Sequence, residues 1–485
     1  MEETLDPQDW SEMQVLGHQM LDDMLEYMQT MRERPPWQHA PDEVRSNFKK
    51  PLPLDPQPPD EIYKEFLENI LPYPIGNNHP RFWGWVFGTG TAMGALAEFL
   101  AATMNTNSGG LAYHSANYVE NQVINWMKEI MGFPETASGL LTSGCSAANL
   151  IGLTVARNTK AEIDIRKSGL HSTPKQMVLY ASEEIHSSVQ KAVEILGLGS
   201  LALRYIAAKD DFRINLKELK TRIFEDRQAG YSPFCIVGAA GTTNTGAVDD
   251  LNALADICQE EDLWLHVDGA FGAWAVLSSS AKELVSGMER ADSLAFDLHK
   301  WMYMPYEIGC VLVRQGQYQR ESFSIHADYL VYGETNRGLV GDDLPWLSDY
   351  GFQLSRAFNS LKAWMSFKEH GIEKYGRLIQ QNIEQARYLA RLIKNSPKLE
   401  LAAPVSLNAV VFRYVHPELE KDELDRINKE IISELQEQGI AVVSGTIIHG
   451  RWVLHVVNTN HRSVREDFDV LIRETLRLGD ELSQI

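Results

Sequence analysis

The stretch LWLHVDGA, residues 263–270, is an apolar run that ends on a carboxylate followed by small residues. Similar short runs rich in β-branched residues are MVLYAS (177–182), FCIVGAAG (234–241), DSLAF (292–296) and IGCVLVR (308–314). Helical patterns fall between them at 189–196, 216–229 and 251–261. Strands that are apolar on both faces and alternate with helices predict a mostly parallel sheet with helices on each side. We therefore predict a large α/β domain.

The sequence on either side of this domain follows other patterns. Apolar residues recur at helical spacing from Trp10 to Met31, and the proline-rich segment 34–60 predicts an extended connector. After a helical stretch at 356–394, we predict a strand (409–414), a helix (421–438), two strands (440–444 and 452–458) and a last helix (464–482). The expected division is an N-terminal helical arm (1–76), a large domain (77–355), and a connecting helix with a small α+β domain (356–485). Such an arm needs a second surface, which favours a homodimer.

Composition limits the classes of function. The chain has 485 residues, of which 44% are hydrophobic and 23% charged, so it can bury a large core. Its net charge of −21 repels nucleic-acid phosphates and anionic lipids, and no uncharged run is long enough for a membrane span. We expect no nucleic-acid partner, no membrane partner and no metal site. Four scattered cysteines and an acidic, polar opening stretch suit a cytoplasmic protein.

Two strand ends carry reactive side chains. Asp268 ends the run LWLHVD, and ligands of open parallel sheets bind at the carboxyl ends of strands. A helix-capping aspartate is the alternative. Lys300 follows DSLAF within HKW, where apolar and aromatic neighbours could lower its pKa and make it an amine nucleophile. The alternative for Lys300 is a solvated surface charge.

Three further segments could complete a site. TSGCSAANLIGL (142–153) leads from small and hydroxyl residues into a helix, where backbone N–H groups can bind a phosphate; a plain serine N-cap is the alternative. The turn at 238–251 could add Thr242 or Thr243 to the same anion, or be a simple loop. His186 follows the run at 177–182 and could stack on a flat cofactor, shuttle protons or cap a helix.

Together these groups are the set that holds pyridoxal phosphate. A carboxylate keeps the pyridine nitrogen protonated, because a neighbouring negative charge raises the pKa of that nitrogen. A lysine holds the aldehyde as a Schiff base. A helix N-terminus neutralises the phosphate, and a histidine ring covers one face of the cofactor.

The motifs HPRFWGW (79–85), SEEIHSS (182–188), HVDGA and HKW, in this order, resemble the group II pyridoxal-phosphate decarboxylases. The resemblance runs from about residue 9 to the C-terminus. It implies the aspartate-aminotransferase fold (fold type I) and a homodimer with the active site at the subunit interface. By position it implies Lys300 as Schiff-base lysine, Asp268 as pyridine partner, Ala270 beneath the ring and His186 stacked on it. It also implies further cofactor contacts from Cys145, Ser146, Thr242 and His299, while Asp297 stands where some members have asparagine.

The resemblance also bears on the reaction. In the family, a tyrosine on a loop from the neighbouring subunit protonates the substrate Cα after CO2 has left. Tyr329 aligns best with that tyrosine, and Tyr332 is close enough to be confused with it. Family members with phenylalanine there tend to be oxygen-consuming aldehyde synthases, so a tyrosine favours the amine. An ordinary exposed aromatic is the alternative.

For the substrate, Phe82, Trp83 and Trp85 resemble the aromatic patch that lines the side-chain pocket of aromatic decarboxylases, although core packing could also explain them. An aromatic L-amino acid (tyrosine, DOPA, phenylalanine or tryptophan) is therefore the expected substrate. The partner-subunit loop at 105–115 is small and polar here, and Ser355 leans towards tyrosine or DOPA rather than tryptophan.

Four alternatives stay open. An aldehyde synthase would release peroxide and ammonia. A decarboxylase of a non-aromatic amino acid is the second alternative, and one of the glutamate type would need a basic distal pocket, which the sequence does not locate. An aminotransferase would need an arginine such as Arg413 or Arg451 to clamp the α-carboxylate. A protein without cofactor, serving only interactions, would not need Lys300 and Asp268 together.

Overall fold

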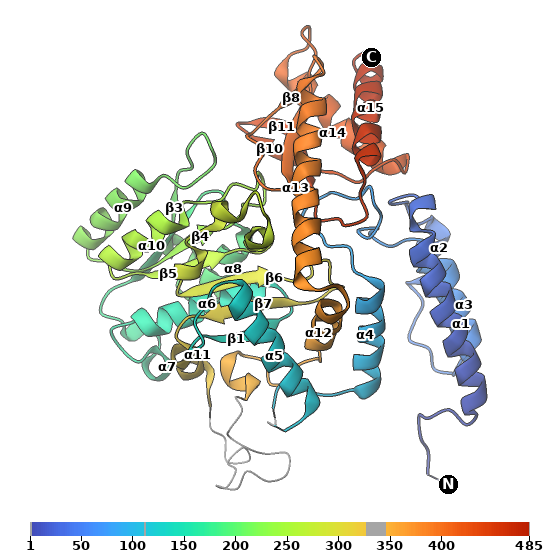
Figure 1. The fold of residues 1–485 in the computed structure, drawn as a ribbon, viewed down its shortest axis with the longest axis horizontal. Coiled ribbons are helices and arrows are strands. Elements are labelled where there is room, and N and C mark those ends of the chain that lie inside the picture. Colours follow the sequence, from blue (N-terminus) through green and yellow to red (C-terminus); the bar gives the residue numbers. More distant parts are fainter. Residues whose placement is uncertain (1, 111–112, 326–345, 485) are drawn as a thin grey trace.

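The computed structural model describes residues 2–110, 113–325 and 346–484. Its central feature is a seven-stranded sheet in the order β1-β7-β6-β5-β4-β2-β3 (Figure 1). The strands are β1 (Ser138–Thr142), β2 (Met177–Ser182), β3 (Leu203–Ile206), β4 (Ser232–Ala239), β5 (Trp264–Asp268), β6 (Ser293–Asp297) and β7 (Gly309–Val313). Only β7 runs antiparallel to its neighbours, β1 and β6. The predicted α/β fold with a mostly parallel sheet is therefore confirmed.

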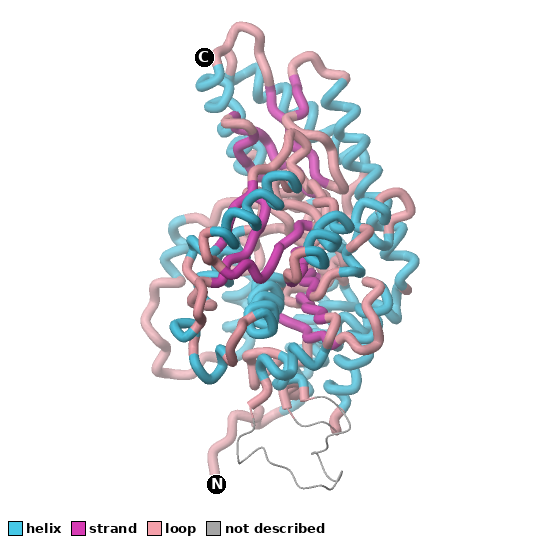
Figure 2. The backbone as a smooth tube through the Cα atoms, turned by 90° about the vertical axis from the view of Figure 1, so that its left-hand side faces the viewer, coloured by secondary structure: helices cyan, strands magenta, loops and turns pink. Residues whose placement is uncertain are grey.

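The helices of the large domain cover this sheet. They are α4 (Ala92–Met104), α5 (Ser115–Ile130), α6 (Cys145–Lys160), α7 (Ile165–Ser168), α8 (Ser187–Ile195), α9 (Leu216–Gln228), α10 (Leu251–Glu260), α11 (Gly316–Phe323) and α12 (Ser360–His370). Helix α6 packs across β5, β6 and β7, whereas α9 and α10 pack on β4. The strands run through the interior of the molecule and the helices surround them (Figure 2).

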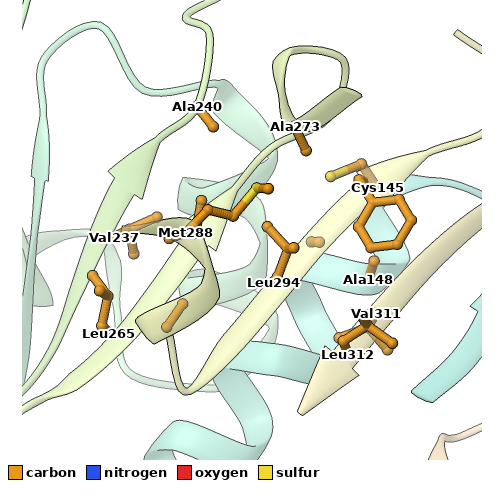
Figure 3. Close-up of a cluster of buried hydrophobic side chains, with 14 of the residues drawn as sticks. Cys145, Ala148, Val237, Ala240, Leu265, Ala273, Met288, Leu294, Val311 and Leu312 are labelled. Atoms are coloured by element: carbon orange, nitrogen blue, oxygen red, sulfur yellow. The ribbon is translucent and has the colours of Figure 1, made fainter. Parts of the chain in front are cut away.

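The core explains why these segments are strands. Every residue of β5, β6 and β7 is buried, as two-sided burial of a central strand requires. Figure 3 shows Val237, Leu265, Leu294 and Val311, from four neighbouring strands, gathered in one apolar cluster with Ala148 of α6. Strands β1 and β3 were not predicted, because β1 (SGLLT) contains only two apolar side chains, and β3 is half exposed and only four residues long.

The C-terminal part has its own sheet and core. Its antiparallel strands, in the order β10-β11-β9-β8, are β8 (Leu399–Leu401), β9 (Ala409–Tyr414), β10 (Ser444–Ile448) and β11 (Arg451–Val457). Helices α13 (Ile372–Lys394), α14 (Lys421–Glu437) and α15 (Arg465–Leu482) pack with them. The division of the chain at residues 76 and 355 stays a prediction, since α12 packs on α4 and α5 of the large domain.

Three local predictions are wrong. The stretch 356–394 holds two helices, because Gly371 ends α12 with φ +68°. The predicted strand 440–444 is displaced to β10, because Val442 pairs with Phe82 instead of joining the sheet. The connector 34–60 contains a short helix, α2 (Asp42–Asn47), which has no internal proline and two acids in its first turn.

At the N-terminus, α1 (Trp10–Gln29) and α3 (Pro59–Asn69) lie side by side at the edge of the molecule, beside α4 (Figure 1). No residue of α1 is buried in the single chain. No described helix combines the length and the apolar character that a membrane crossing requires.

Candidate functional site

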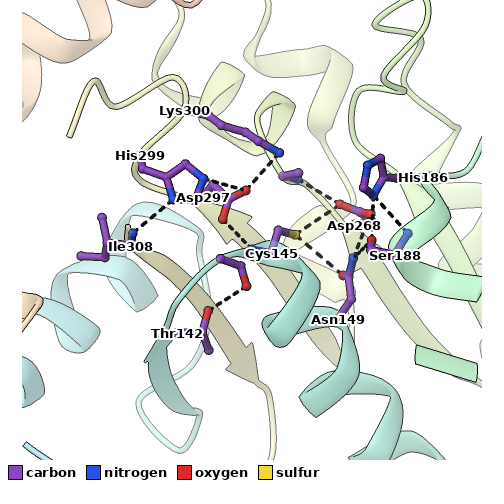
Figure 4. A network of polar contacts seen from close by, with 12 residues as sticks. Thr142, Cys145, Asn149, His186, Ser188, Asp268, Asp297, His299, Lys300 and Ile308 are labelled. Atoms are coloured by element: carbon purple, nitrogen blue, oxygen red, sulfur yellow. Dashed lines mark hydrogen bonds and ion pairs between the residues drawn. The ribbon is translucent and has the colours of Figure 1, made fainter. Parts of the chain in front are cut away.

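The candidate site lies where β5 and β6 end beside the start of α6. Asp268 is the last residue of β5, Asp297 is the last of β6, and Lys300 follows three residues later. Cys145 begins α6 and faces both carboxylates (Figure 4). This is the position at which open α/β sheets bind ligands.

Lys300 forms an ion pair with Asp297, whose Oδ2 lies 3.0 Å from Nζ. Burial opposes the charge of the lysine, but the neighbouring groups, Asp297 above all, outweigh burial and raise the pKa of Lys300. The prediction that desolvation lowers this pKa is therefore wrong for the protein alone. Asp297 Oδ1 also accepts the Cys145 N–H at 2.6 Å, so the first backbone N–H of α6 is already hydrogen-bonded to a side-chain carboxylate of the protein.

Asp268 is held by three donors. Its carboxylate accepts from Asn149 Nδ2 at 3.0 Å, the Ala270 N–H at 3.1 Å and Cys145 Sγ at 3.4 Å. Because the short 3-10 helix that follows (Gly272–Leu277) has no side-chain cap, Asp268 caps no helix. It is 6% exposed and borders the cavity described below, so it can pair with a cationic group there.

His186 stands at the N-cap of α8, with its ring exposed at the cavity. Its Nδ1 accepts the Ser188 N–H at 3.2 Å and lies 2.8 Å from Ser188 Oγ. Desolvation lowers the pKa of this imidazole. The helix-capping interpretation of His186 is therefore confirmed, and the residue also borders the cavity, while its stacking on a cofactor stays a prediction.

A cavity of about 260 Å³ joins these groups. Its lining is Trp85, Val86, Phe87, Glu184, Ile185, His186, Ala239, Gly241, Thr242, Thr243, Asp268, Ala270, Phe271 and Lys300. Seven residues that the sequence analysis singled out thus meet in one place: Trp85, His186, Thr242, Thr243, Asp268, Ala270 and Lys300. Val86, Phe87, Glu184 and Phe271 were missed, although the first two continue the motif HPRFWGW. A larger groove of about 870 Å³ along α13 contains no lysine or histidine in its described lining.

Three predicted contacts, Cys145, Ser146 and His299, lie outside the cavity lining, and the hydroxyl of a fourth, Thr242 in the lining, is engaged within the chain. Cys145 is buried behind Asp268, and burial raises the pKa of its thiol. His299 is buried with Nε2 3.6 Å from Asp297, and burial lowers its pKa to about 4. Ser146 is exposed, and the Thr242 hydroxyl is paired with that of Thr245 at 3.0 Å. Tyr329 and Tyr332 lie outside the described residues.

Three predicted substrate residues do not line the cavity of their own chain. Trp83 is 1% exposed, stacks on Phe468 at 4.7 Å between ring centroids, and donates to Ser463, so it belongs to the C-terminal core. Phe82 is buried behind the lining, with its ring 6.0 Å from that of Phe87. Ser355 is exposed and lies outside the lining. Of the predicted aromatic patch, only Trp85 borders the cavity.

The two arginines proposed for an aminotransferase clamp are engaged elsewhere. Arg413 is buried on β9 and pairs with Asp425 and Glu400. Arg451 on β11 pairs with Glu400 at 3.0 Å. Neither lines the cavity, so these arginines give no support to an aminotransferase. Within the described ranges, no group of three or more His, Cys, Asp or Glu side chains could hold a metal ion.

Comparison with known proteins gives consistent matches. A family model described as "Pyridoxal-dependent decarboxylase conserved domain" matches residues 41–415. The chain is 35% identical over 475 residues to an aromatic-L-amino-acid decarboxylase from Bacillus atrophaeus, which covers 97% of this chain and 96% of that protein. It is 27% identical over 454 residues to a phenylacetaldehyde synthase from Petunia hybrida, covering 90% and 88%. The crystal structure of Oryza sativa TDC with PLP and tryptamine has the same fold, with a TM-score of 0.90, 23% identity, and coverage of 99% and 100%.

Proposed function

The chain belongs to the pyridoxal-dependent decarboxylase family, and from this premise we propose that it converts an aromatic L-amino acid into the corresponding amine and CO2. The cofactor is pyridoxal phosphate. The observation that carries the proposal is that Lys300, Asp268 and His186 line one cavity together with the rings of Trp85 and Phe87.

The residues of the cavity fit the cofactor at its aldehyde and its ring. When bound, pyridoxal phosphate supplies an electron sink for the electron pair that remains after CO2 leaves. Lys300 would hold the aldehyde carbon, and Asp268 would keep a proton on the ring nitrogen. Ala270 is small enough to lie beneath a flat ring, and His186 would cover the ring from the rim of the cavity.

The lining favours an aromatic substrate with a hydrogen-bond donor. Trp85, Val86 and Phe87 give one wall of the cavity an apolar surface. Glu184 adds a carboxylate that accepts from Asn244 at 3.2 Å, and burial raises its pKa. Lys300 is the only lysine or arginine in the described lining, so an acidic substrate side chain would lack a partner. A phenol or indole suits this wall better than a second carboxylate.

We also propose a homodimer with the active site at the subunit interface. Trp10, Val15 and Phe99 on α1 and α4 are each more than 60% exposed in the single chain, so these apolar side chains are available for contact with a second subunit. The loop at 105–110 lies against the segment at 354–356, where the Ser108 N–H donates to the Arg356 carbonyl at 2.9 Å. The loop at 105–110 and the segment with Ser355, which the resemblance connects with the substrate, thus lie together but do not line the cavity of the same chain.

A reducing compartment, the cytosol, is part of the proposal. All four cysteines are buried and free of disulfides. Disulfide-free cysteines are typical of proteins in reducing compartments.

The test is to incubate the protein and pyridoxal phosphate with a panel of L-amino acids and to follow CO2, amine, aldehyde and peroxide together. Amine and CO2 in equal amounts from an aromatic substrate are expected. Lys300→Ala should lose turnover and the absorbance of lysine-bound cofactor, and activity near that of the wild type would contradict the assignment. Tyr329→Phe should shift products from amine to aldehyde and peroxide. Unchanged amine would move the role of acid to Tyr332.

A further inference from the structure

A buried chain of hydrogen bonds leads from the core to the cavity. Trp264 Nε1 lies 2.8 Å from Ser293 Oγ, and Ser293 Oγ lies 2.8 Å from His266 Nδ1. His266 Nε2 lies 2.9 Å from Asn149 Oδ1. These four residues are each at most 3% exposed, so each depends on its neighbours for hydrogen bonds.

At Asn149 the chain divides into two branches. Asn149 Nδ2 donates to Asp268 Oδ2 at 3.0 Å and to Ser188 Oγ at 3.1 Å. Ser188 Oγ lies 2.8 Å from His186 Nδ1 (Figure 4). One side-chain amide therefore contacts the carboxylate of the proposed site directly and its histidine through one hydroxyl.

The chemistry of the two ends fixes the direction of every bond. An indole nitrogen can only donate, so Ser293 Oγ accepts from Trp264 and keeps its own hydrogen for a second bond. A carboxylate can only accept, so the amide nitrogen of Asn149 faces Asp268, and its oxygen accepts from His266 Nε2–H. His266 therefore carries a hydrogen on Nε2, and in the neutral ring Nδ1 accepts the hydrogen of Ser293. Burial, which lowers the pKa of His266 to about 4, keeps it neutral.

The same direction extends to His186. His186 Nδ1 accepts the Ser188 N–H at 3.2 Å and therefore carries no hydrogen, so Ser188 Oγ, which accepts from Asn149, gives its own hydrogen to the same nitrogen. A proton on Nδ1 would face both donors. We propose that Asn149 is a positioning residue that holds Asp268 as an acceptor and fixes His186 as the neutral Nε2–H tautomer.

The backbone of α6 is adapted to this chain. Gly152 lies inside the helix, where glycine is less favourable than alanine. A Cβ at Gly152 would lie 2.6 Å from His266 Cε1 and 2.7 Å from Nδ1. The glycine therefore leaves the space that the imidazole fills.

The first test reads the tautomer in the protein without cofactor, so it does not depend on the proposed function. Ring ¹⁵N spectra of histidine-labelled protein, with the His186 signals assigned by their loss in His186→Gln, should show a neutral Nε2–H ring at pH 7–8. The charges around His186 are Asp268, Asp297, Lys300 and Lys191, and they are unchanged in every variant below. In Asn149→Leu, the pKa of His186 should rise and mixed tautomers should appear.

The second test uses the branching of the chain, and it rests on the proposed function. Asn149→Leu should weaken binding of pyridoxal phosphate about tenfold or more, because a hydrogen bond to a charged carboxylate is lost. Ser188→Ala should raise the pKa of His186 but weaken cofactor binding much less, because Asn149 still contacts Asp268. Asn158→Leu, on the same helix beside Arg157, is the matched control and should change neither quantity.

If Asn149→Leu does not fold, Ser293→Ala removes a single oxygen and should shift the His186 titration in the same direction. An unchanged His186 spectrum in both variants would refute the proposal, as would equal loss of cofactor affinity in Asn149→Leu and Asn158→Leu. Failure of the wild-type protein to bind pyridoxal phosphate would refute the proposed function and leave the tautomer result standing.

Discussion

Replacing Asp297 by asparagine should make Lys300 a better nucleophile. Asparagine has the same shape and its Oδ1 can still accept the Cys145 N–H, so the change removes one charge and little else. At the observed 3.0 Å, a pair of unit charges interacts by about 5 kcal/mol at an effective dielectric constant of ~20. One pKa unit corresponds to about 1.4 kcal/mol, so losing only a quarter of this interaction energy would lower the pKa by about one unit. We expect the pKa of Lys300 to fall by at least about one unit.

The assay is capture of pyridoxal, which lacks the phosphate, by the protein without cofactor. Only the neutral amine attacks the aldehyde, so the rate rises with pH through the pKa of Lys300. In Asp297→Asn the midpoint should move to lower pH, and capture below both midpoints should be about tenfold faster or more. Pyridoxal phosphate should gain further, because the removed charge lies at the helix N-terminus.

Glu183→Gln is the matched control. It removes one carboxylate charge near the cavity, from an exposed side chain that accepts the Ala208 N–H and has no ion pair with Lys300. Its capture midpoint should equal that of the wild type. A midpoint in Asp297→Asn that is unchanged, or higher, would refute the electrostatic role of Asp297.

Three further predictions concern packing and stability. Trp83→Ala should lower the free energy of unfolding, measured in urea, by about 3–5 kcal/mol and leave KM unchanged, whereas Phe87→Ala should raise KM in steady-state kinetics. A substrate preference altered by Trp83→Ala would contradict the assignment of Trp83 to the C-terminal core. Arg356→Met should cost about 3–5 kcal/mol in urea unfolding, because it leaves Glu120, 1% exposed and 2.5 Å from Arg356, without its positively charged partner. A loss below about 1 kcal/mol would show that the pair is dispensable. Acidification from pH 7 to 5 should destabilise the fold, because the unfolded chain binds more protons than the native one between pH 6.5 and 4. Burial lowers the pKa of each of five histidines to about 4, and each therefore adds about 2 kcal/mol to the loss of unfolding free energy on acidification. Burial raises the pKa of Asp249 to about 6, which reduces this loss by only about 1 kcal/mol. Equal unfolding free energies at pH 7 and 5 would contradict this balance. The histidines are His79, His266, His299, His455 and His461.

Sequence reasoning was strongest where a short apolar run ends on a polar residue. Asp268 and Lys300 were found because each follows a fully buried strand, and neighbouring parallel strands end at the same edge of a sheet. It was weaker in the irregular segment 79–87. There Trp83 and Trp85 both read as pocket aromatics, yet Trp83 enters the C-terminal core and Trp85 borders the cavity. No periodicity distinguishes them, because the partners of this segment lie more than 350 residues away.

Charge was also decided by contacts distant in sequence. Apolar neighbours in the sequence predicted a lowered pKa for Lys300, whereas the carboxylate of Asp297 raises it. The sequence likewise identified His186 but not His266, because a histidine inside a strand resembles any core residue until Asn149 and Ser293 are seen beside it.

The sequence by itself determined the α/β architecture, the strand ends that carry Asp268 and Lys300, and the family, because local periodicity and short motifs encode them. Only the tertiary structure decided which aromatic rings border the cavity, the sign of the pKa shift of Lys300, and the path from Trp264 to His186. These properties depend on distances and on donor and acceptor pairing between segments far apart in the chain, and burial makes such pairing obligatory.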